Sequence, residues 1–227
     1  MKINADDGFN PELFGDIPCE GTFELPKFTS PVEFRIPGEM IPFSHIDKAT
    51  DPANTFVVFY EKDNSFAEFV KNPEHFVEKL KKFKGVVSPD ISLCLDSPLA
   101  VIIANTYRNH ALGCYLQRQG IYVIPNVRWA DKRTYTSSNF SSRIAFDGIP
   151  KHSIVSIGSY GCLKEKEYRK HFAAGLEEML KTLLPKVVLV YGNLPAQIFD
   201  KYKDQTTFIA YKDWLSNDFE RHCHGNR

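Results

Sequence analysis

From Thr55 to Ala210 the sequence alternates between short apolar runs and longer amphipathic segments. The apolar runs are rich in valine, isoleucine and aromatic residues, which is typical of buried strands. Strands are expected at 55–60, 85–88, 121–125, 153–158, 186–191 and 206–210. Strands that alternate with helices favour right-handed βαβ units. We therefore predict an α/β fold with a mostly parallel sheet of about six strands, either an incomplete or distorted TIM-like barrel or an open doubly wound sheet.

Helices are predicted between these strands, because proline and glycine mark their ends. Pro73 and Pro98 stand at first helical positions, Gly120 follows a helix, and Pro185 stops another. The expected helices lie at 72–83, 97–119, 141–146, 164–184 and 195–202.

The first 54 residues differ in composition from the rest and hold half of the 14 prolines, interleaved with phenylalanines. Proline fixes φ and removes a backbone donor, so long regular elements are disfavoured there. We predict an arm that lays aromatic rings over the body, with short edge strands near 22–25 and 32–36. The chain then divides into an extended N-terminal arm at 1–54, an α/β domain at 55–211 and a polar C-terminal tail at 212–227.

The charges balance, with 28 Lys plus Arg against 28 Asp plus Glu. Proteins that coat DNA or an anionic membrane usually carry a basic excess, so no membrane partner is expected and nucleic acid is a weaker alternative. The five cysteines are widely spread without a CxxC pair, which favours free thiols in a reducing compartment. The N-terminus lacks the apolar core of a signal peptide, and we expect a cytoplasmic protein.

Polar residues follow several of the predicted strands at the point where each strand ends. Ligands bind at the carboxyl ends of parallel strands, so these residues can converge on one cleft. Asp63 and Asp90 are the candidate catalytic residues, because a carboxylate can act as a general base or hold a metal ion. The candidate ligand-binding residues are Asn126, Arg128, Trp129, Tyr160, Tyr191 and Arg108. Of these, Arg128 would hold an anion.

Structural roles compete with these functional ones. An aspartate after Ser-Pro often caps a turn or the next helix, which applies to Asp90 and in similar measure to Asp63. Asn105, Arg108 and Asn109 share one face of the long helix, and this pattern favours an anchor for a neighbouring loop.

No metal or cofactor is assigned. His110 and Cys114 have a spacing that can chelate zinc on a helix, but only the tail residues 222–224 could complete the site. The segment 128–143 interleaves basic and aromatic residues, a pattern that single-stranded nucleic acid can use, although an ordinary surface loop is favoured.

Several short motifs between Ile41 and Tyr211, taken together, are specific. They are Ile41-Pro42-Phe43, Ser88-Pro89-Asp90, the helix residues Asn105, Tyr107, Arg108 and Gly113, then Ile124-Pro125, Trp129, Phe146-Asp147-Gly148-Ile149-Pro150 and Tyr191-Gly192. With them the chain resembles an uncharacterised bacterial and phage family called domain of unknown function forty-four seventeen. The resemblance implies phage or mobile-element biology and brings no known activity. It also departs from the family in one acidic loop, where Asp63 stands without a second adjacent aspartate.

Three functions are consistent with this pattern. The first is binding or processing of a small phosphorylated or nucleotide-like ligand in a polar cleft at the strand ends. The second is a non-enzymatic accessory role, in which the arm and the helix face around Tyr107 bind a host or defence protein. The third and weakest is binding of single-stranded nucleic acid through 128–143. Whether the protein is an enzyme stays open at this point.

Overall fold

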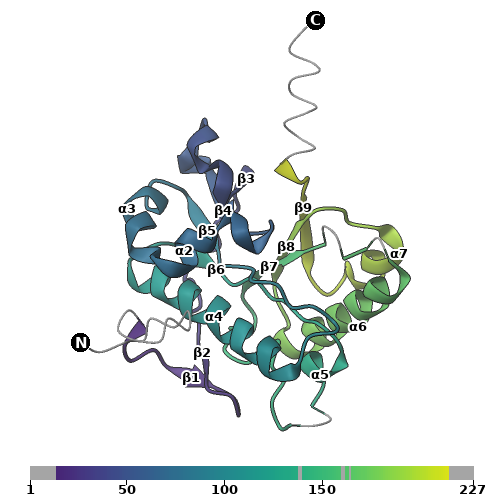
Figure 1. The fold of residues 1–227 in the computed structure, drawn as a ribbon. Coiled ribbons are helices and arrows are strands. Elements are labelled where there is room, and N and C mark those ends of the chain that lie inside the picture. The colour runs from purple at the N-terminus through teal and green to yellow at the C-terminus, as the bar shows by residue number, and fades with distance from the viewer. Residues whose placement is uncertain (1–13, 138–139, 160–161, 164, 215–227) are drawn as a thin grey trace, which may run out of the picture.

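Parallel strands follow one another in chain order through the whole of the main sheet (Figure 1). The computed structural model describes residues 14–137, 140–159, 162–163 and 165–214. The parallel strands are β3 (Glu39–Pro42), β4 (Thr55–Val58), β5 (Gly85–Val87), β6 (Val123–Ile124), β7 (Ile154–Gly158), β8 (Val187–Tyr191) and β9 (Thr207–Tyr211). They form a four-stranded part, β3 to β6, and a three-stranded part, β7 to β9.

The two parts join at the junction of β6 and β7. Asn126 and Ser156 form a parallel bridge, the Ser156 amide donates to Pro125 O, and the Val127 amide donates to Ser156 O. The strand order is therefore continuous from β3 to β9. All six predicted strands are confirmed, with ends that shift by no more than a few residues.

Short and long helices connect the strands. They are α2 (Ala67–Lys71), α3 (Val77–Leu80), α4 (Leu99–Arg118), α5 (Lys132–Tyr135), α6 (Lys166–Leu183) and α7 (Ala196–Phe199), with 3₁₀ helices η1 (Phe43–Lys48), η2 (Pro52–Asn54), η3 (Asp63–Ser65), η4 (Pro73–Phe76) and η5 (Asp200–Tyr202). The long helix α6 ends where Leu184 adopts a left-handed conformation with φ of 48°, before Pro185. That end confirms the stop predicted from the proline.

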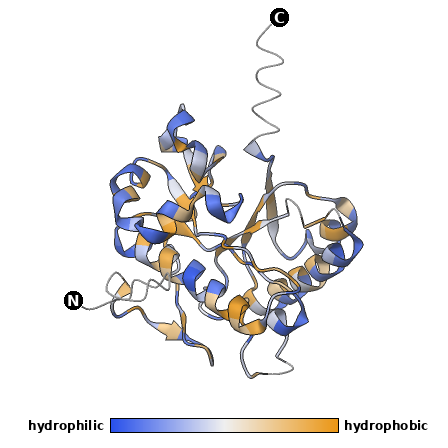
Figure 2. Ribbon diagram, viewed as in Figure 1, coloured by the Kyte–Doolittle hydropathy of each residue, from blue (hydrophilic) through white to orange (hydrophobic). Residues whose placement is uncertain are grey.

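The two faces of the sheet are buried in different ways. One face packs against α4 and α6, since Val86 and Val188 of the strands belong to one apolar cluster with Leu112 of α4 and Leu176 of α6. The other face carries a second cluster built from strands and the arm, which comprises Met40, Phe56, Val58, Tyr60, Val87, Ile124, Ile154, Leu189 and Tyr191, with Phe34 and Ile36 against it. Figure 2 shows the apolar residues gathered on the strands and the polar ones on the outer sides of the helices.

The second cluster joins strands from both parts of the sheet. Phe56 and Leu189 come from strands in different parts of the sheet, yet both are fully buried in this second cluster. A doubly wound sheet would instead show a reversal in strand order and helices on both faces. Among the described residues the strand order shows no reversal and β9 does not pair with β3, so the parallel sheet is open between these two strands.

The N-terminal segment contributes more to the sheet than the sequence indicates. β3 lies inside the range predicted as an arm, and pairs in parallel with β4. Pro42 is its last residue, a position that an edge strand tolerates. Further upstream, β1 (Cys19–Glu20) and β2 (Leu25–Pro26) form a small antiparallel hairpin, close to the edge strand expected near 22–25.

Two local predictions are wrong. The segment 32–36 is not a strand, because Arg35 N and Glu33 O bond to the hydroxyl of Tyr122 rather than to a neighbouring strand. The segment 141–146 is a series of turns, whereas the helix of this region is α5, capped by Asp131, which accepts from Arg133 N. No helix within the described ranges has the length and apolar character needed to cross a membrane.

Candidate functional site

A buried charge pair stands where β5 and β6 end. Arg128 Nη1 donates to Asp90 Oδ2 at 2.6 Å, and Asn126 Nδ2 donates to Asp90 Oδ1 at 2.7 Å. The Asp90 side chain is 5% exposed and that of Arg128 is 26% exposed. Asn126 is itself fixed by its backbone amide, which donates to Ser88 Oγ at 2.8 Å. Parallel pairing of β5 with β6 thus brings three of the predicted residues together.

Burial and charge oppose each other at this pair. Burial raises the pKa of Asp90, while the positive charge of Arg128 and the hydrogen bond from Asn126 lower it. The pKa of Arg128 is raised, chiefly by the Asp90 carboxylate. Removing a charge from water is costly unless a partner compensates it, so each member of the pair depends on the other for its ionised state.

Tyr60, at the end of β4, extends this network into the sheet. Its hydroxyl donates to Asn126 Oδ1 at 3.0 Å and lies 2.8 Å from Ser156 Oγ. A phenol has one proton to donate, so Ser156 is the donor in the second bond. Burial, followed by the charge of Asp90, raises the pKa of Tyr60 well above its usual value. We call Tyr60, Asp90, Asn126 and Arg128 the carboxyl rim.

Packing holds the Tyr60 ring in place from two sides. The Tyr191 ring stacks on it with a centroid distance of 5.1 Å and an interplanar angle of 21°. On Gly158 a Cβ would come within 2.8 Å of the Tyr60 ring, so this position requires glycine. Tyr191 in turn accepts a bond from the Trp214 amide through its hydroxyl at 2.9 Å. Tyr191 is thus 2% exposed and supports the rim from within the sheet.

The two predicted catalytic aspartates occupy different environments. Asp63, in η3, is exposed and accepts from Ser92 N at 3.2 Å and from Ser92 Oγ at 2.9 Å. These bonds tie η3 to the loop after β5. The Asp63 charge still acts on the pair, since it raises the pKa of both Asp90 and Arg128. The structure brings Asp63 to the same end of the sheet without a direct bond to Asp90 among the described contacts.

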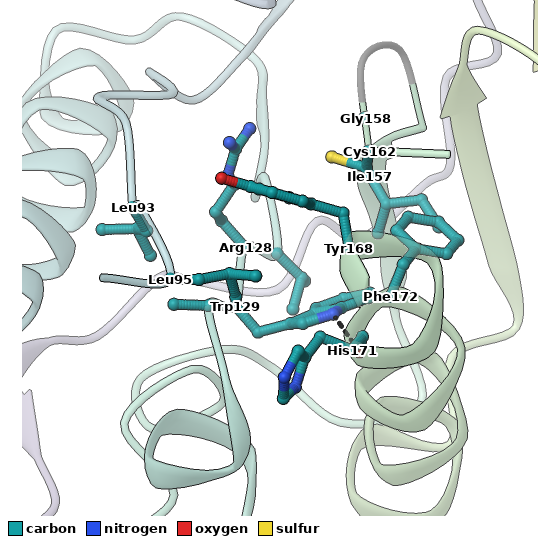
Figure 3. Close-up of a pocket in the computed structure, with 12 residues that line it drawn as sticks. Leu93, Leu95, Arg128, Trp129, Ile157, Gly158, Cys162, Tyr168, His171 and Phe172 are labelled. Carbon is teal, nitrogen blue, oxygen red and sulfur yellow. Dashed lines mark hydrogen bonds between the residues drawn. The ribbon is translucent and has the colours of Figure 1, made fainter. Parts of the chain in front are cut away.

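A pocket of about 240 Å³ adjoins the exposed side of Arg128 (Figure 3). Aromatic and aliphatic side chains make up most of its wall. It is lined by Leu93, Leu95, Val127, Arg128, Trp129, Ala130, Ile157, Gly158, Cys162, Tyr168, His171 and Phe172. In Figure 3 the rings of Tyr168 and Trp129 border the pocket, and the Cys162 sulfur points toward the side on which Arg128 stands. Such an apolar pocket with few polar groups is the usual form of a small-molecule site.

Helix α6 supplies one wall of this pocket. Tyr168, His171 and Phe172 follow one another at helical spacing, and Trp129 Nε1 donates to His171 O at 3.2 Å. Burial raises the pKa of Cys162, the charge of Arg128 lowers it and the charge of Asp90 raises it. The pKa of this thiol therefore depends on the charge pair. The sequence analysis did not identify Leu93, Tyr168, His171 or Phe172. The aromatic triplet at spacings of three and four was the available signal.

Other predicted residues lie elsewhere. Arg108 Nη1 donates to Asn105 Oδ1 at 3.0 Å, and Asn105 Nδ2 donates to Ser92 O at 3.0 Å. Asn109 bonds both the amide and the carbonyl of Ile91. The helix face therefore anchors the loop after β5, the structural role that its pattern favoured, and Arg108 does not line the pocket. The predicted ligand residue Tyr160 lies outside the described residues.

The structure describes part of the residues behind the two remaining alternatives, the zinc site and the nucleic-acid loop. His110 is buried and its Nδ1 lies 3.2 Å from Pro26 O, and no group of three potential metal ligands exists within the described part of the chain. In the segment 128–143, the Tyr135 ring is buried, and the Trp129 ring borders the pocket rather than the outer surface of the loop. Arg143 bonds Thr182. The residues 222–224 of the proposed zinc alternative lie outside the described ranges.

Together, the fold and the rim define an α/β protein with a pocket at the carboxyl ends of its parallel strands. A family model described as "Domain of unknown function (DUF4417)" matches residues 17–212, so the chain belongs to this family. This confirms the resemblance found in the sequence.

Two curated relatives are similar over 136 residues, which are 60% of this chain. The "Gene 1 protein" of Mycobacterium phage D29 is 35% identical, with 48% of its length covered. The "Gene 1 protein" of Mycobacterium phage L5 is 34% identical, with 56% covered. The matched region thus spans about half the length of these relatives. No solved structure matches the chain significantly.

Proposed function

We propose that the pocket beside the carboxyl rim binds a small nucleotide-like ligand, with or without phosphate, in the context of phage or mobile-element biology. The observation that carries this proposal is the position of Arg128. One of its nitrogens is bound to Asp90, while the side chain remains partly exposed where it lines an aromatic pocket. A flat ring can pack on Tyr168 and Trp129 while a polar group of the ligand meets the guanidinium.

The rim gives Asp90 a positioning role in this proposal. Both of its oxygens already accept a bond, from Asn126 and from Arg128, and its side chain is almost fully buried. A carboxylate with this geometry fixes the orientation of the arginine. General-base roles for Asp63 and Asp90 stay predictions that the binding experiment does not need. The two phage relatives support the biological context and carry no activity in their names.

Calorimetry of the full chain tests the proposal. The probes are the common nucleosides and their mono- and triphosphates, titrated into wild type and Tyr168→Ala. Tyr168 is 40% exposed, so its truncation should leave the fold intact. Stacking of a base on an aromatic ring is worth about 1–3 kcal/mol, so we expect affinity to fall at least about fivefold.

Two further variants make the result specific. Arg128→Lys keeps the charge opposite Asp90 but loses the planar fork, and should weaken binding as well. Lys181→Gln removes a cation near the far end of α6, where Lys181 pairs with Glu177, and should leave affinity unchanged. The proposal is wrong if no probe binds at millimolar concentration. It is also wrong if the probes bind Tyr168→Ala and Arg128→Lys with the same affinity as wild type.

A further inference from the structure

The charges around the pocket are already compensated by the protein itself. Among the described residues that line it, Arg128 is the one arginine and no lysine is present. Its guanidinium contacts the Asp90 carboxylate at 2.6 Å. His171, on the α6 wall, lies 3.5 Å from the Glu167 carboxylate.

A second arginine next to the pocket is also paired with a carboxylate. Arg133 Nη2 donates to the carbonyl of the lining residue Leu95 at 3.3 Å, and the same nitrogen pairs with Asp131 at 2.7 Å. Asp63 adds a further negative charge close enough to act on both Asp90 and Arg128. At the polar end of the pocket, the described groups Arg128 and Arg133 thus stand against three carboxylates, those of Asp63, Asp90 and Asp131.

A polyanion gains little from such a site. Phosphate sites usually concentrate uncompensated cations or helix N-termini, because a multiply charged group loses strong hydration when it binds. Here the wall is mostly apolar, and Arg128, the arginine among its described residues, is paired with the Asp90 carboxylate. The remaining donors of an arginine can still pair with a carbonyl or ring nitrogen, as they do on the edge of a nucleobase.

We infer that the pocket takes a planar, nearly uncharged ring with hydrogen-bond acceptors on its edge, a nucleobase or nucleoside, and discriminates against polyphosphates. This inference rests on the proposed function and names its ligand class. Tyr168 and Trp129 provide the ring contacts and Arg128 the donors (Figure 3). The carboxylates around them repel additional negative charge.

The test is the charge dependence of affinity within one nucleoside series at low and high salt. We expect the triphosphate to bind at least about tenfold more weakly than the parent nucleoside at low salt, with the gap narrowing as salt screens the repulsion. Asp63→Asn removes one negative charge outside the rim, at the same end of the sheet, and should improve triphosphate affinity about threefold while leaving nucleoside affinity unchanged. Asp200→Asn, at an exposed pair with Lys203, is the matched control and should change neither.

The outcomes separate this inference from the proposed function. Triphosphates that bind more tightly than nucleosides, with affinity lost in salt, would overturn the inference and leave the proposed function standing. Equal affinity across the series, insensitive to Asp63→Asn, would also overturn it. If no member of any charge binds, the proposed function itself fails, and this inference falls with it.

Discussion

Two regions of the molecule pair their polar side chains in different ways. Under the arm, polar side chains bond to backbone groups: Gln117 bonds the Thr29 amide and carbonyl, and His110 approaches Pro26 O. At the carboxyl rim, charged and amide side chains bond one another, as Arg128 does with Asp90. We call the first region, residues 14–37 with the side chains that contact them, the arm contact.

The two regions also differ in what lies beside their pockets. In the arm contact Phe28 packs on His110 at 5.2 Å, the Tyr211 hydroxyl donates to Pro37 O at 2.8 Å, and Thr29 and Gln117 bond each other at the wall of a second pocket of about 330 Å³. The rim keeps an arginine partly exposed beside a pocket. Charge deletion should therefore act most strongly on the rim, whereas acid should act on the arm contact.

The largest effect is expected from Asp90→Ala. This change leaves Arg128 without its carboxylate and Asn126 Nδ2 with the longer bond to Pro89 O alone among the described contacts. Breaking a buried ion pair by removal of one partner typically costs about 3–5 kcal/mol in free energy of unfolding. Urea unfolding at pH 7 measures this loss, which lowers the urea concentration at the unfolding midpoint and leaves the slope of free energy against urea unchanged.

Two controls make the Asp90 result interpretable. Asp63→Ala removes an exposed carboxylate from the same end of the sheet and should cost less than about 1 kcal/mol. Adding Arg128→Met to Asp90→Ala removes the stranded cation and should recover part of the loss. Equal destabilisation by both alanine variants would mean that the rim is no more dependent on its charges than the surface is.

Acid should destabilise the arm contact through His110. Burial lowers the pKa of this histidine from 6.5 to about 4. Between these two pH values the unfolded chain binds a proton that the folded protein does not, so stability is full above pH 6.5 and falls as the pH drops toward 4. The shift corresponds to a loss of about 3 kcal/mol.

A variant isolates this residue from the other titrating groups. His110→Gln keeps a donor for Pro26 O but does not titrate. The difference in unfolding free energy between wild type and this variant should change by about 3 kcal/mol from pH 7 to pH 4. Parallel stability profiles would show that His110 does not carry the acid sensitivity.

The sequence predicted most of the sheet, since runs such as 186–191 have a period and composition that only a buried strand explains. It did not predict β3, whose segment Glu39–Pro42 has two apolar residues at its centre and a proline at its end. That strand owes its existence to pairing with β4, a long-range contact that local propensity does not report.

The candidate site was predictable in part, for a related reason. Asp90, Asn126 and Arg128 each follow a strand end, and parallel pairing brings such positions together. The pocket wall was not predicted, because the charges at 164–170 around Tyr168 indicate a solvated helix start and outweigh the aromatic spacing. Which side of a helix faces a pocket depends on how the helix docks, and composition does not specify that.

The smallest effect is expected from Tyr60→Phe at the rim, and its effect on ligand affinity distinguishes the rim from the arm contact. Tyr60→Phe removes one hydroxyl, so Asn126 Oδ1 loses its donor and Ser156 its acceptor. We expect a loss of about 1–2 kcal/mol in stability. Since Tyr60 also orients the Asn126 amide toward Asp90, ligand affinity should fall about threefold, a change of roughly 0.7 kcal/mol.

Tyr211→Phe deletes the hydroxyl that bonds Pro37 O and should lower stability without changing affinity. If the two variants change affinity equally, the rim does not act as a unit; if only Tyr60→Phe does, its hydroxyl positions the arginine through Asn126 and Asp90.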